Sequence, residues 1–229
     1  MTETSPALGR LLPADRFHTG VRLATLGLWV LSIAVAYLVL LVVATQIFGP
    51  LPGPGVLLVI LAAVVIAQPL AWLGEKQLLA RWPSGRAVQL EPGGLVWRDR
   101  GPTARLDLGQ KVNFWRWRFS VKRRRSGRVP GNYHCFALRL VQGDTLLTLY
   151  SFLPPATAEA LAARYPFYEL RRPNDPGKTP LGGRDSMFLA AERTRWEEGA
   201  ELEPGDFEAL LAHLSARLTD FERAAQSGV

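Results

Sequence analysis

Two long apolar runs dominate the first third of the chain. No Asp, Glu, Lys, Arg or His occurs from residue 23 to residue 74, and within this stretch 23–48 and 56–73 are runs of 26 and 18 residues rich in Leu, Val, Ala and Ile. A helix needs about 20 apolar residues, with a range of about 17–25, to cross the hydrocarbon core of a bilayer. The intervening Gly-Pro-Leu-Pro-Gly-Pro-Gly segment resists helix formation, because proline removes hydrogen-bond donors and glycine favours turns. The pattern therefore predicts a transmembrane hairpin over residues 23–73.

The charges that flank the two runs predict their orientation. Three arginines precede the first run and three cations follow the second, whereas the turn carries no charge. These six residues are Arg10, Arg16, Arg22, Lys76, Arg81 and Arg86. Because positively charged flanks stay on the cytoplasmic side, we expect both termini in the cytoplasm, with residues 1–22 as a cytoplasmic segment. A signal peptide is disfavoured, because the first run is too long for one and a second run follows at once.

After the hairpin, the pattern changes to short strand-like segments. Apolar and polar residues alternate in short runs separated by turns that contain Gly and Pro, which is typical of antiparallel strands. The predicted strands are 87–91, 95–99, 103–108, 111–123, 133–141 and 145–152, with 167–171 as a candidate seventh. Residues 156–165 have the composition of a helix. We therefore expect a membrane-anchored α+β protein in which a small antiparallel β-barrel or sandwich, residues 86–172, is capped by a helix.

The C-terminal segment is predicted to begin as a linker and continue as an acidic helical tail. Residues 173–184 are rich in Pro and Gly, which disfavours regular structure. In the tail, residues 185–229, Asp206 is a good helix N-cap and apolar residues follow it at helical spacing. These residues are Phe207, Leu210, Leu211, Leu214, Leu218 and Phe221. They predict an amphipathic helix that docks either on its own domain or on a partner helix.

The net charge of +7 is the difference between two unlike segments. Residues 75–172 carry 18 basic and 7 acidic groups, whereas residues 173–229 carry 6 basic and 11 acidic groups. Eight cations occur between residues 111 and 128 without one acid. They are Lys111, Arg116, Arg118, Lys122, Arg123, Arg124, Arg125 and Arg128. Aromatic residues alternate with the arginines of this strand, which predicts an aromatic face toward the core and a cationic face toward solvent.

Three kinds of partner attract a cationic face of this kind. They are the anionic lipid headgroups of the cytoplasmic leaflet, an acidic protein surface (the chain's own tail included) and nucleic acid. Nucleic acid is disfavoured, because the aromatic side chains alternate onto the opposite face and cannot stack with bases. Membrane lipids and a protein partner, or self-assembly of the chain, both stay open.

The residues that usually carry catalysis are scattered along the chain. His18, His134 and His213 lie in three separate regions, and Cys135 is the only cysteine. His134 and Cys135 are adjacent in a predicted strand, so their side chains point to opposite faces and cannot act as a nucleophile–base pair. One cysteine forms no internal disulfide, and with so few histidines it builds no structural zinc site. We therefore expect a non-enzymatic protein without a metal ion or cofactor.

Two stretches carry a resemblance to a known family. The segment QLEPGGLVWRD forms the first predicted hairpin of the strand-rich domain, and LPPATAEALAARY forms its helix. Together with the preceding two-span hairpin, this order of elements over about residues 20–170 resembles bacterial pleckstrin-homology-like membrane proteins. The resemblance implies a curved, seven-stranded sheet capped by a helix and used for binding or assembly in the bacterial inner membrane. It brings no catalytic residues.

These observations together predict a multi-pass inner-membrane protein. Its cytoplasmic pleckstrin-homology-like domain is expected to bind anionic lipid headgroups or an acidic protein surface. The alternative is an accessory or scaffolding subunit of a larger membrane complex, held by the hairpin and by the C-terminal helix.

Overall fold

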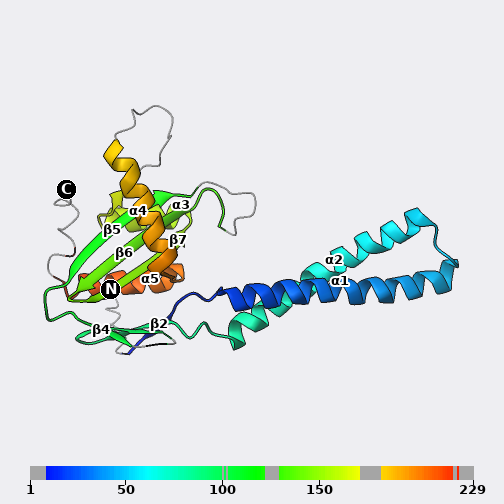
Figure 1. Ribbon diagram of the computed structural model, residues 1–229, viewed down its shortest axis with the longest axis horizontal. Coiled ribbons are helices and arrows are strands. Elements are labelled where there is room, and N and C mark those ends of the chain that lie inside the picture. Colours follow the sequence, from blue (N-terminus) through cyan, green and yellow to red (C-terminus); the bar gives the residue numbers. More distant parts are fainter. Residues whose placement is uncertain are drawn as a thin grey trace, which may run out of the picture. The chain divides into compact units, whose positions relative to one another are not determined.

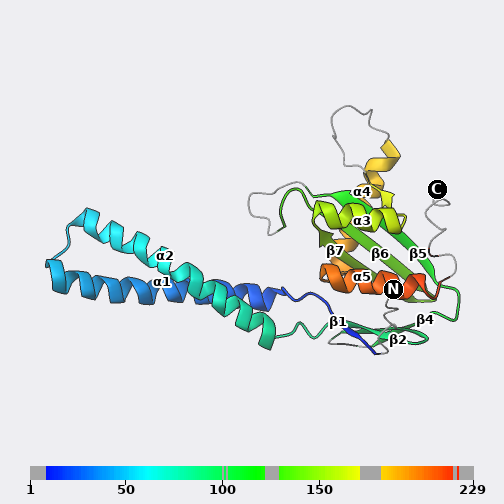
Figure 2. The same cartoon turned by 180° about the vertical axis from the view of Figure 1, so that it is seen from behind.

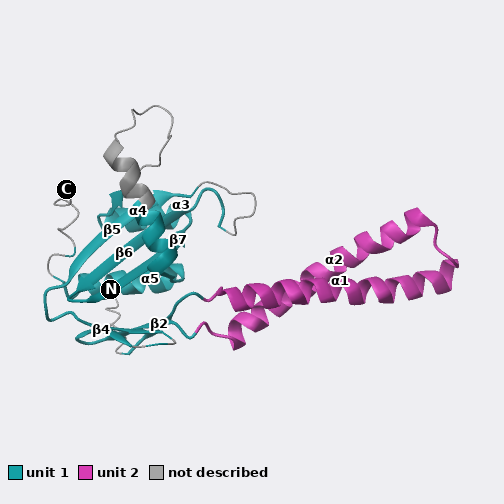
Figure 3. Cartoon of the chain, viewed as in Figure 1, with its two compact units in different colours: residues 1–15, 85–229 teal, residues 16–84 magenta. Residues whose placement is uncertain are grey.

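The computed structural model describes residues 9–99, 101, 103–121, 129–170, 182–218 and 221, with residues 182–189 described by their backbone only. The chain forms two compact units (Figure 3). The helical unit is residues 16–84, and the other unit, which we call the sheet domain, combines residues 1–15 with residues 85–229. The helical unit is therefore an insertion in the sequence of the sheet domain.

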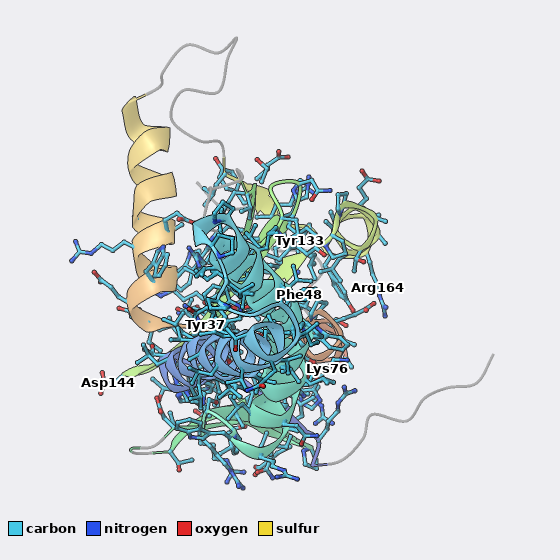
Figure 4. All side chains as sticks on the ribbon, turned by 90° about the vertical axis from the view of Figure 1, so that its right-hand side faces the viewer. Tyr37, Phe48, Lys76, Tyr133, Asp144 and Arg164 are labelled. Atoms are coloured by element: carbon cyan, nitrogen blue, oxygen red, sulfur yellow. The ribbon has the colours of Figure 1, made fainter. Side chains whose placement is uncertain are left out.

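The helical unit consists of α1 (Thr19–Phe48) and α2 (Gly53–Arg81). Gly49 ends α1 with a φ of 76°, a conformation that glycine adopts without strain. Both helices are long and apolar enough to cross a membrane, which confirms the two predicted apolar helices. Most of their large apolar side chains are exposed, for example Leu38 at 59% and Val65 at 71%. Figure 4 shows these side chains, with Tyr37, Phe48 and Lys76 labelled.

Small residues and one hydrogen bond hold the two helices together. Every fourth residue along the middle of α2 is an alanine that is at most 7% exposed. These residues are Ala63, Ala67 and Ala71. A Cβ added to Gly74 would lie 1.9 Å from Leu28 Cδ2, so the Leu28 side chain occupies the space beside this glycine. The Trp29 Nε1–H donates to Gln68 Oε1 over 2.6 Å, and small residues with occasional polar bridges are typical of packed membrane helices.

The first sheet of the sheet domain is antiparallel, with the order β1-β2-β3-β4 (Figures 1 and 2). Its strands are β1 (Leu11–Pro13), β2 (Ala87–Glu91), β3 (Gly94–Arg98) and β4 (Ala104–Asp107). The β2–β3 hairpin uses the predicted Pro-Gly-Gly turn. Gly94 is required at its end, because an added Cβ would lie 2.3 Å from the Leu106 backbone oxygen of β4.

The second sheet is mixed, with the order β8-β5-β6-β7-β9. Its strands are β5 (Asn113–Ser120), β6 (His134–Gln142), β7 (Thr145–Leu153), β8 (Tyr168–Glu169) and β9 (Gly199–Glu201). The three long strands pair antiparallel, whereas β8 is parallel to β5 and β9 is parallel to β7. The six predicted strands are confirmed as β2 to β7, and the candidate seventh as the two-residue β8.

Helices cover both faces of the second sheet. The helices α3 (Pro155–Arg164) and α5 (Pro204–Ser215) lie on one face and α4 (Gly182–Glu198) lies on the other (Figures 1 and 2). The main core, with Leu138 and Leu149 from the strands, is under α3 and α5. A smaller core, with Phe119 and Cys135, is under α4, so this sheet is buried on both sides.

The α+β layout is confirmed, but in the described part of the chain the two sheets stay open and neither closes into a barrel. They are joined at two places. An isolated antiparallel bridge links Ala14 to Leu202. At the second place, the Gln142 side-chain amide accepts from the Asp107 N–H and donates to the Asp107 carbonyl oxygen, each over 2.8 Å.

The segment predicted as an acidic tail is part of the sheet domain. Residues 171–181, which include most of the predicted linker, lie outside the described residues, and α4 already begins at Gly182. After α4, β9 extends the second sheet. The helix α5 has 12 residues, with Glu203 at its N-cap, so it is shorter than the predicted helix and starts earlier.

The strands on either side of the inserted helical unit pair directly with each other. Pro13 stands opposite Ala87 and Leu11 opposite Gln89 in the β1–β2 register. The N-terminal segment is therefore an edge strand of the sheet domain, whereas the sequence predicted only a cytoplasmic segment before the hairpin. The chain leaves the sheet domain and returns to it at one place.

Candidate functional site

The structure describes three of the eight cations that the sequence placed in one run, namely Lys111, Arg116 and Arg118. Lys111 is exposed in the connection between β4 and β5. Residues 122–128, which contain five of the eight cations, lie outside the described residues and follow the other end of β5. In the sequence, Lys111 therefore precedes β5 and the segment 122–128 follows it.

Arg116 is buried, so the prediction of a solvent-facing cation is wrong for this residue. Its side chain is 6% exposed, and it lies in register with Leu138 on the face of the sheet that carries the main core. The guanidinium carbon lies 4.3 Å from the ring centroid of Phe221, 5.4 Å from that of Phe114 and 5.8 Å from that of Phe167. A guanidinium stacks well on aromatic faces, so Arg116 packs among these rings in the core and is not part of a surface.

Arg118 forms an ion pair beside β5, and the aromatic residues of this strand differ in their exposure. The Arg118 Nη2 lies 3.1 Å from Glu169 Oε2, and the Arg118 side chain is 27% exposed. Trp117 and Phe119 are buried as predicted, at 8% and 3%, but Trp115 is 53% exposed. Among the described cations of the run, Lys111 is the exposed one.

The apolar face of α5 packs on its own domain. Phe207, Leu210, Leu211 and Leu214 are 0% exposed and belong to the main core. Leu218 packs against the same core, and Phe221 is also fully buried, 5.0 Å from the ring of Phe114. Of the two docking alternatives, the structure therefore shows docking on the chain's own domain. These six side chains are not free to hold a partner helix.

A polar network at the hairpin insertion was missed by sequence reasoning. Asp15 accepts from Arg86 Nη1 over 2.5 Å and from the Glu201 N–H over 2.8 Å. Its own N–H donates to the Glu201 carbonyl oxygen over 2.8 Å. Arg86 also donates through Nε to Asp99 Oδ2 over 3.1 Å and stacks over Trp97. We call Asp15, Arg86, Asp99 and Glu201 the insertion network, because it joins the two ends of the insertion to β9.

The sequence did contain one signal for this network. Asp15 and Arg86 are opposite charges that bracket the whole apolar segment, one before α1 and one after α2. Asp15 also has a φ of 49°, the one positive φ found at a described residue other than glycine. Such a conformation persists only where surrounding contacts hold it, and here the contacts with Arg86 and Glu201 do so. A second tie runs from the N-terminal segment to α5, where Arg10 Nη2 lies 2.9 Å from Asp206 Oδ1.

Buried groups with shifted pKa values lie in two places of the described sheet domain. Under α4, burial raises the pKa of the Cys135 thiol and of the Tyr150 hydroxyl far above their ordinary ranges, because removal from water disfavours the charged forms. Arg195 stacks on Tyr150 at 5.1 Å. Under the β2–β3 turn, burial lowers the pKa of His213, and nearby Arg217 lowers it further. The described part of the chain holds no cluster of His, Cys, Asp and Glu suited to a metal ion.

Comparisons with known proteins leave the family open. No family model matches the chain, and neither a curated protein nor a solved structure matches it. The resemblance to pleckstrin-homology-like membrane proteins therefore stays a prediction.

Proposed function

We propose that this protein is a membrane-anchored, non-catalytic binding module for anionic lipid headgroups. The helical unit crosses the membrane twice, both chain termini lie on the cytoplasmic side, and the sheet domain acts at that surface. A bacterial inner membrane of the kind suggested by the pleckstrin-homology-like resemblance is the expected location.

The observation that carries the proposal is the pairing of β1 with β2 around the insertion. Because Pro13 stands opposite Ala87, both ends of the helical unit start from one edge of the sheet domain. Two helices that leave and return at one edge enter and leave a membrane on the same side. This agrees with the cations that flank the apolar segment at both ends and with the uncharged turn.

The lipid-binding part of the proposal concerns the segment 122–128. Its sequence, Lys-Arg-Arg-Arg-Ser-Gly-Arg, has five cations and no acid. A Lys or Arg near an anionic leaflet contributes about 1 kcal/mol, and this attraction falls off within a Debye length of about 10 Å at 0.1 M salt. Because the hairpin already holds the domain at the membrane, these cations orient the domain and do not need to recruit it.

The test uses the full chain in nanodiscs with a polarity-sensitive fluorophore on a cysteine at position 126 (Ser126→Cys). The native Cys135 is fully buried, so labelling is selective. At low salt, we expect a blue-shifted emission in discs with 30% phosphatidylglycerol but not in pure phosphatidylcholine, and we expect 0.5 M salt to abolish the shift. Replacement of Lys122, Arg123, Arg124 and Arg125 by Ser removes it.

The matched control is Lys111→Ser, which removes one exposed cation at the opposite end of β5 and is expected to keep the shift. An emission that is equal in both lipids, or that survives the four substitutions, overturns the lipid proposal. If the emission is equal in both lipids and one acidic protein co-purifies in a stoichiometric amount, the basic segment binds that protein and not the lipid.

A further inference from the structure

The two membrane helices have charge-free segments of unequal length. In α2 the charge-free part runs over residues 53–74, whereas in α1 it runs over residues 23–48. At 1.5 Å per residue these are about 33 Å and about 39 Å long, against about 30 Å for a hydrocarbon core. The length of α2 is therefore close to that of the hydrocarbon core, and the charge-free part of α1 is about one turn longer than that of α2.

The packing between the helices decides which part of α1 lies outside the hydrocarbon core. Leu28 is in contact with Gly74, since an added Cβ on Gly74 would lie 1.9 Å from Leu28 Cδ2. Leu28 is therefore level with the last charge-free residue of α2. From that level to the end of α1, residues 28–48 span about 32 Å. Measured from the Leu28–Gly74 level to the turn, the two helices have nearly the same length, close to the thickness of the hydrocarbon.

Aromatic and cationic side chains mark the same level. Trp72, which is 55% exposed, precedes Gly74 by two residues, whereas the Trp29 N–H donates to Gln68 further inside the span. The Lys76 Nζ lies 3.6 Å from the ring centroid of Trp72. Tryptophan concentrates where hydrocarbon meets headgroups, because its ring is apolar and its N–H is polar. The Lys76 backbone lies about 3 Å beyond the Leu28–Gly74 level, and its side chain reaches back over the Trp72 ring, so the ammonium lies close to that level.

We propose that the hydrocarbon boundary crosses the helical unit at the Leu28–Gly74 level, and that Lys76, held over Trp72, binds the phosphate of a phospholipid there. This inference rests on the proposed function, because it requires that the helices cross a membrane. Residues 19–27 and 75–81 then form a two-helix stalk outside the hydrocarbon. The stalk is about 11–14 Å long, which exceeds the roughly 5–7.5 Å depth of one headgroup layer.

The competing boundary lies five residues, about 7.5 Å, nearer the start of α1, at Leu23, where its charge-free run begins. Because the helices are antiparallel, that boundary would draw Glu75 and Lys76 about 5–6 Å into the hydrocarbon. A charged side chain in the hydrocarbon costs up to about 3 kcal/mol at the bilayer centre. Exposure of Leu23 and Leu26 in the headgroup layer costs less, since that layer is only partly aqueous.

Cysteine accessibility in phosphatidylcholine–phosphatidylglycerol vesicles locates the boundary. N-ethylmaleimide reacts with the thiolate, which does not form in hydrocarbon. The variants Leu26→Cys and Leu31→Cys test α1, and Gln77→Cys and Leu70→Cys test α2, all at side chains that the structure exposes. We expect Leu26→Cys and Gln77→Cys to react at least about tenfold faster than their partners. Protection of Leu26→Cys together with Leu31→Cys places the boundary at Leu23 and overturns the inference.

The variant Leu38→Cys distinguishes a failure of this inference from a failure of the proposed function. If it reacts as fast as Leu26→Cys, the helices are not in the membrane and the proposed function fails as well. The phosphate site is tested by native mass spectrometry of the full chain released from the same vesicles. Lys76→Gln is expected to lose at least half of the retained phospholipid, with Arg193→Gln in α4 as the control that loses none. Full retention by Lys76→Gln overturns the phosphate site.

Discussion

The Arg86 guanidinium donates to the Asp15 carboxylate over 2.5 Å, although 71 positions separate the two residues in the sequence. Both residues border the inserted helical unit. Asp15 precedes it and Arg86 follows it by two residues, and the Ala14 N–H donates to the Arg86 carbonyl oxygen over 2.9 Å beside them. These contacts therefore connect the two segments of the sheet domain that the helical unit separates in the sequence. This relationship leads to the first two predictions.

Replacement of residues 16–84 by a short Gly-Ser turn is expected to yield a soluble, folded sheet domain. The two chain ends at the insertion are already joined by backbone pairing, so a short turn closes them without strain. The measurement is size-exclusion chromatography with thermal unfolding followed by circular dichroism. The companion fragment 86–172 lacks β1, β9 and α5, which exposes the main core, and it is expected to aggregate. A soluble, cooperatively folding 86–172 fragment contradicts this prediction.

Asp15→Ala is expected to destabilise the sheet domain by about 1–3 kcal/mol. The substitution removes the acceptor for Arg86 and for the Glu201 N–H, and hydrogen bonds to a charged, largely buried group have this magnitude. The measurement is urea unfolding of the domain without the insertion. Arg193→Ala is the control, because it removes an exposed i,i+4 pair with Glu197 and is expected to cost less than about 0.5 kcal/mol. Equal effects of the two substitutions would show that the insertion network stabilises nothing.

Arg116→Ala is expected to destabilise the domain by about 2 kcal/mol or more, because it leaves a cavity between three phenylalanine rings. Arg116→Met fills part of that space and is expected to cost less. Neither substitution is expected to change the lipid-dependent fluorescence of the full chain, although each removes a cation. A changed lipid response with unchanged stability would show that Arg116 belongs to the lipid-binding surface.

Below about pH 6.5, His213 is expected to make the sheet domain less stable. Its pKa is lowered in the folded state by burial first and by Arg217 second, so the unfolded state binds the proton more readily. The contribution of His213 is constant above the ordinary histidine pKa of about 6.5 and is lost as the pH falls through that value, with a slope of at most about 1.4 kcal/mol per pH unit. Urea unfolding between pH 7.5 and pH 5 measures it. His213→Gln is expected to flatten the dependence of the unfolding free energy on pH. An unchanged dependence in the variant would show that other groups cause it.

Local patterns were sufficient for the elements that are formed by neighbouring residues. The strands β2 to β7 and the helix α3 lie within a few residues of their predicted bounds, because each has its own period and its own turn. The strands β1 and β9 were missed because each has three residues, too few to show a period. Their existence depends on partners that are distant in sequence, as the pairing of Leu11 with Gln89 illustrates.

The error at Arg116 has a different physical cause. A period of two tells which residues share a face but not which face is covered. The second sheet is covered on both faces, by α3 and α5 on one side and by α4 on the other, so both sets of residues in β5 are partly buried. Neither the length of α4 nor the return of the tail to the sheet was visible from β5, and the cationic face was therefore assigned to solvent.

The position of the helical unit between two paired strands also has a consequence for the order of synthesis. β1 leaves the ribosome before its partner β2 has been made, and a free loop of that length would add to the entropic cost of pairing. The two packed helices of the hairpin bring their ends together and remove most of that cost. If the helices cross a membrane as proposed, correct insertion is a precondition for rapid completion of the first sheet, and a chain with only one helix inserted would carry β1 and β2 on opposite sides of the membrane.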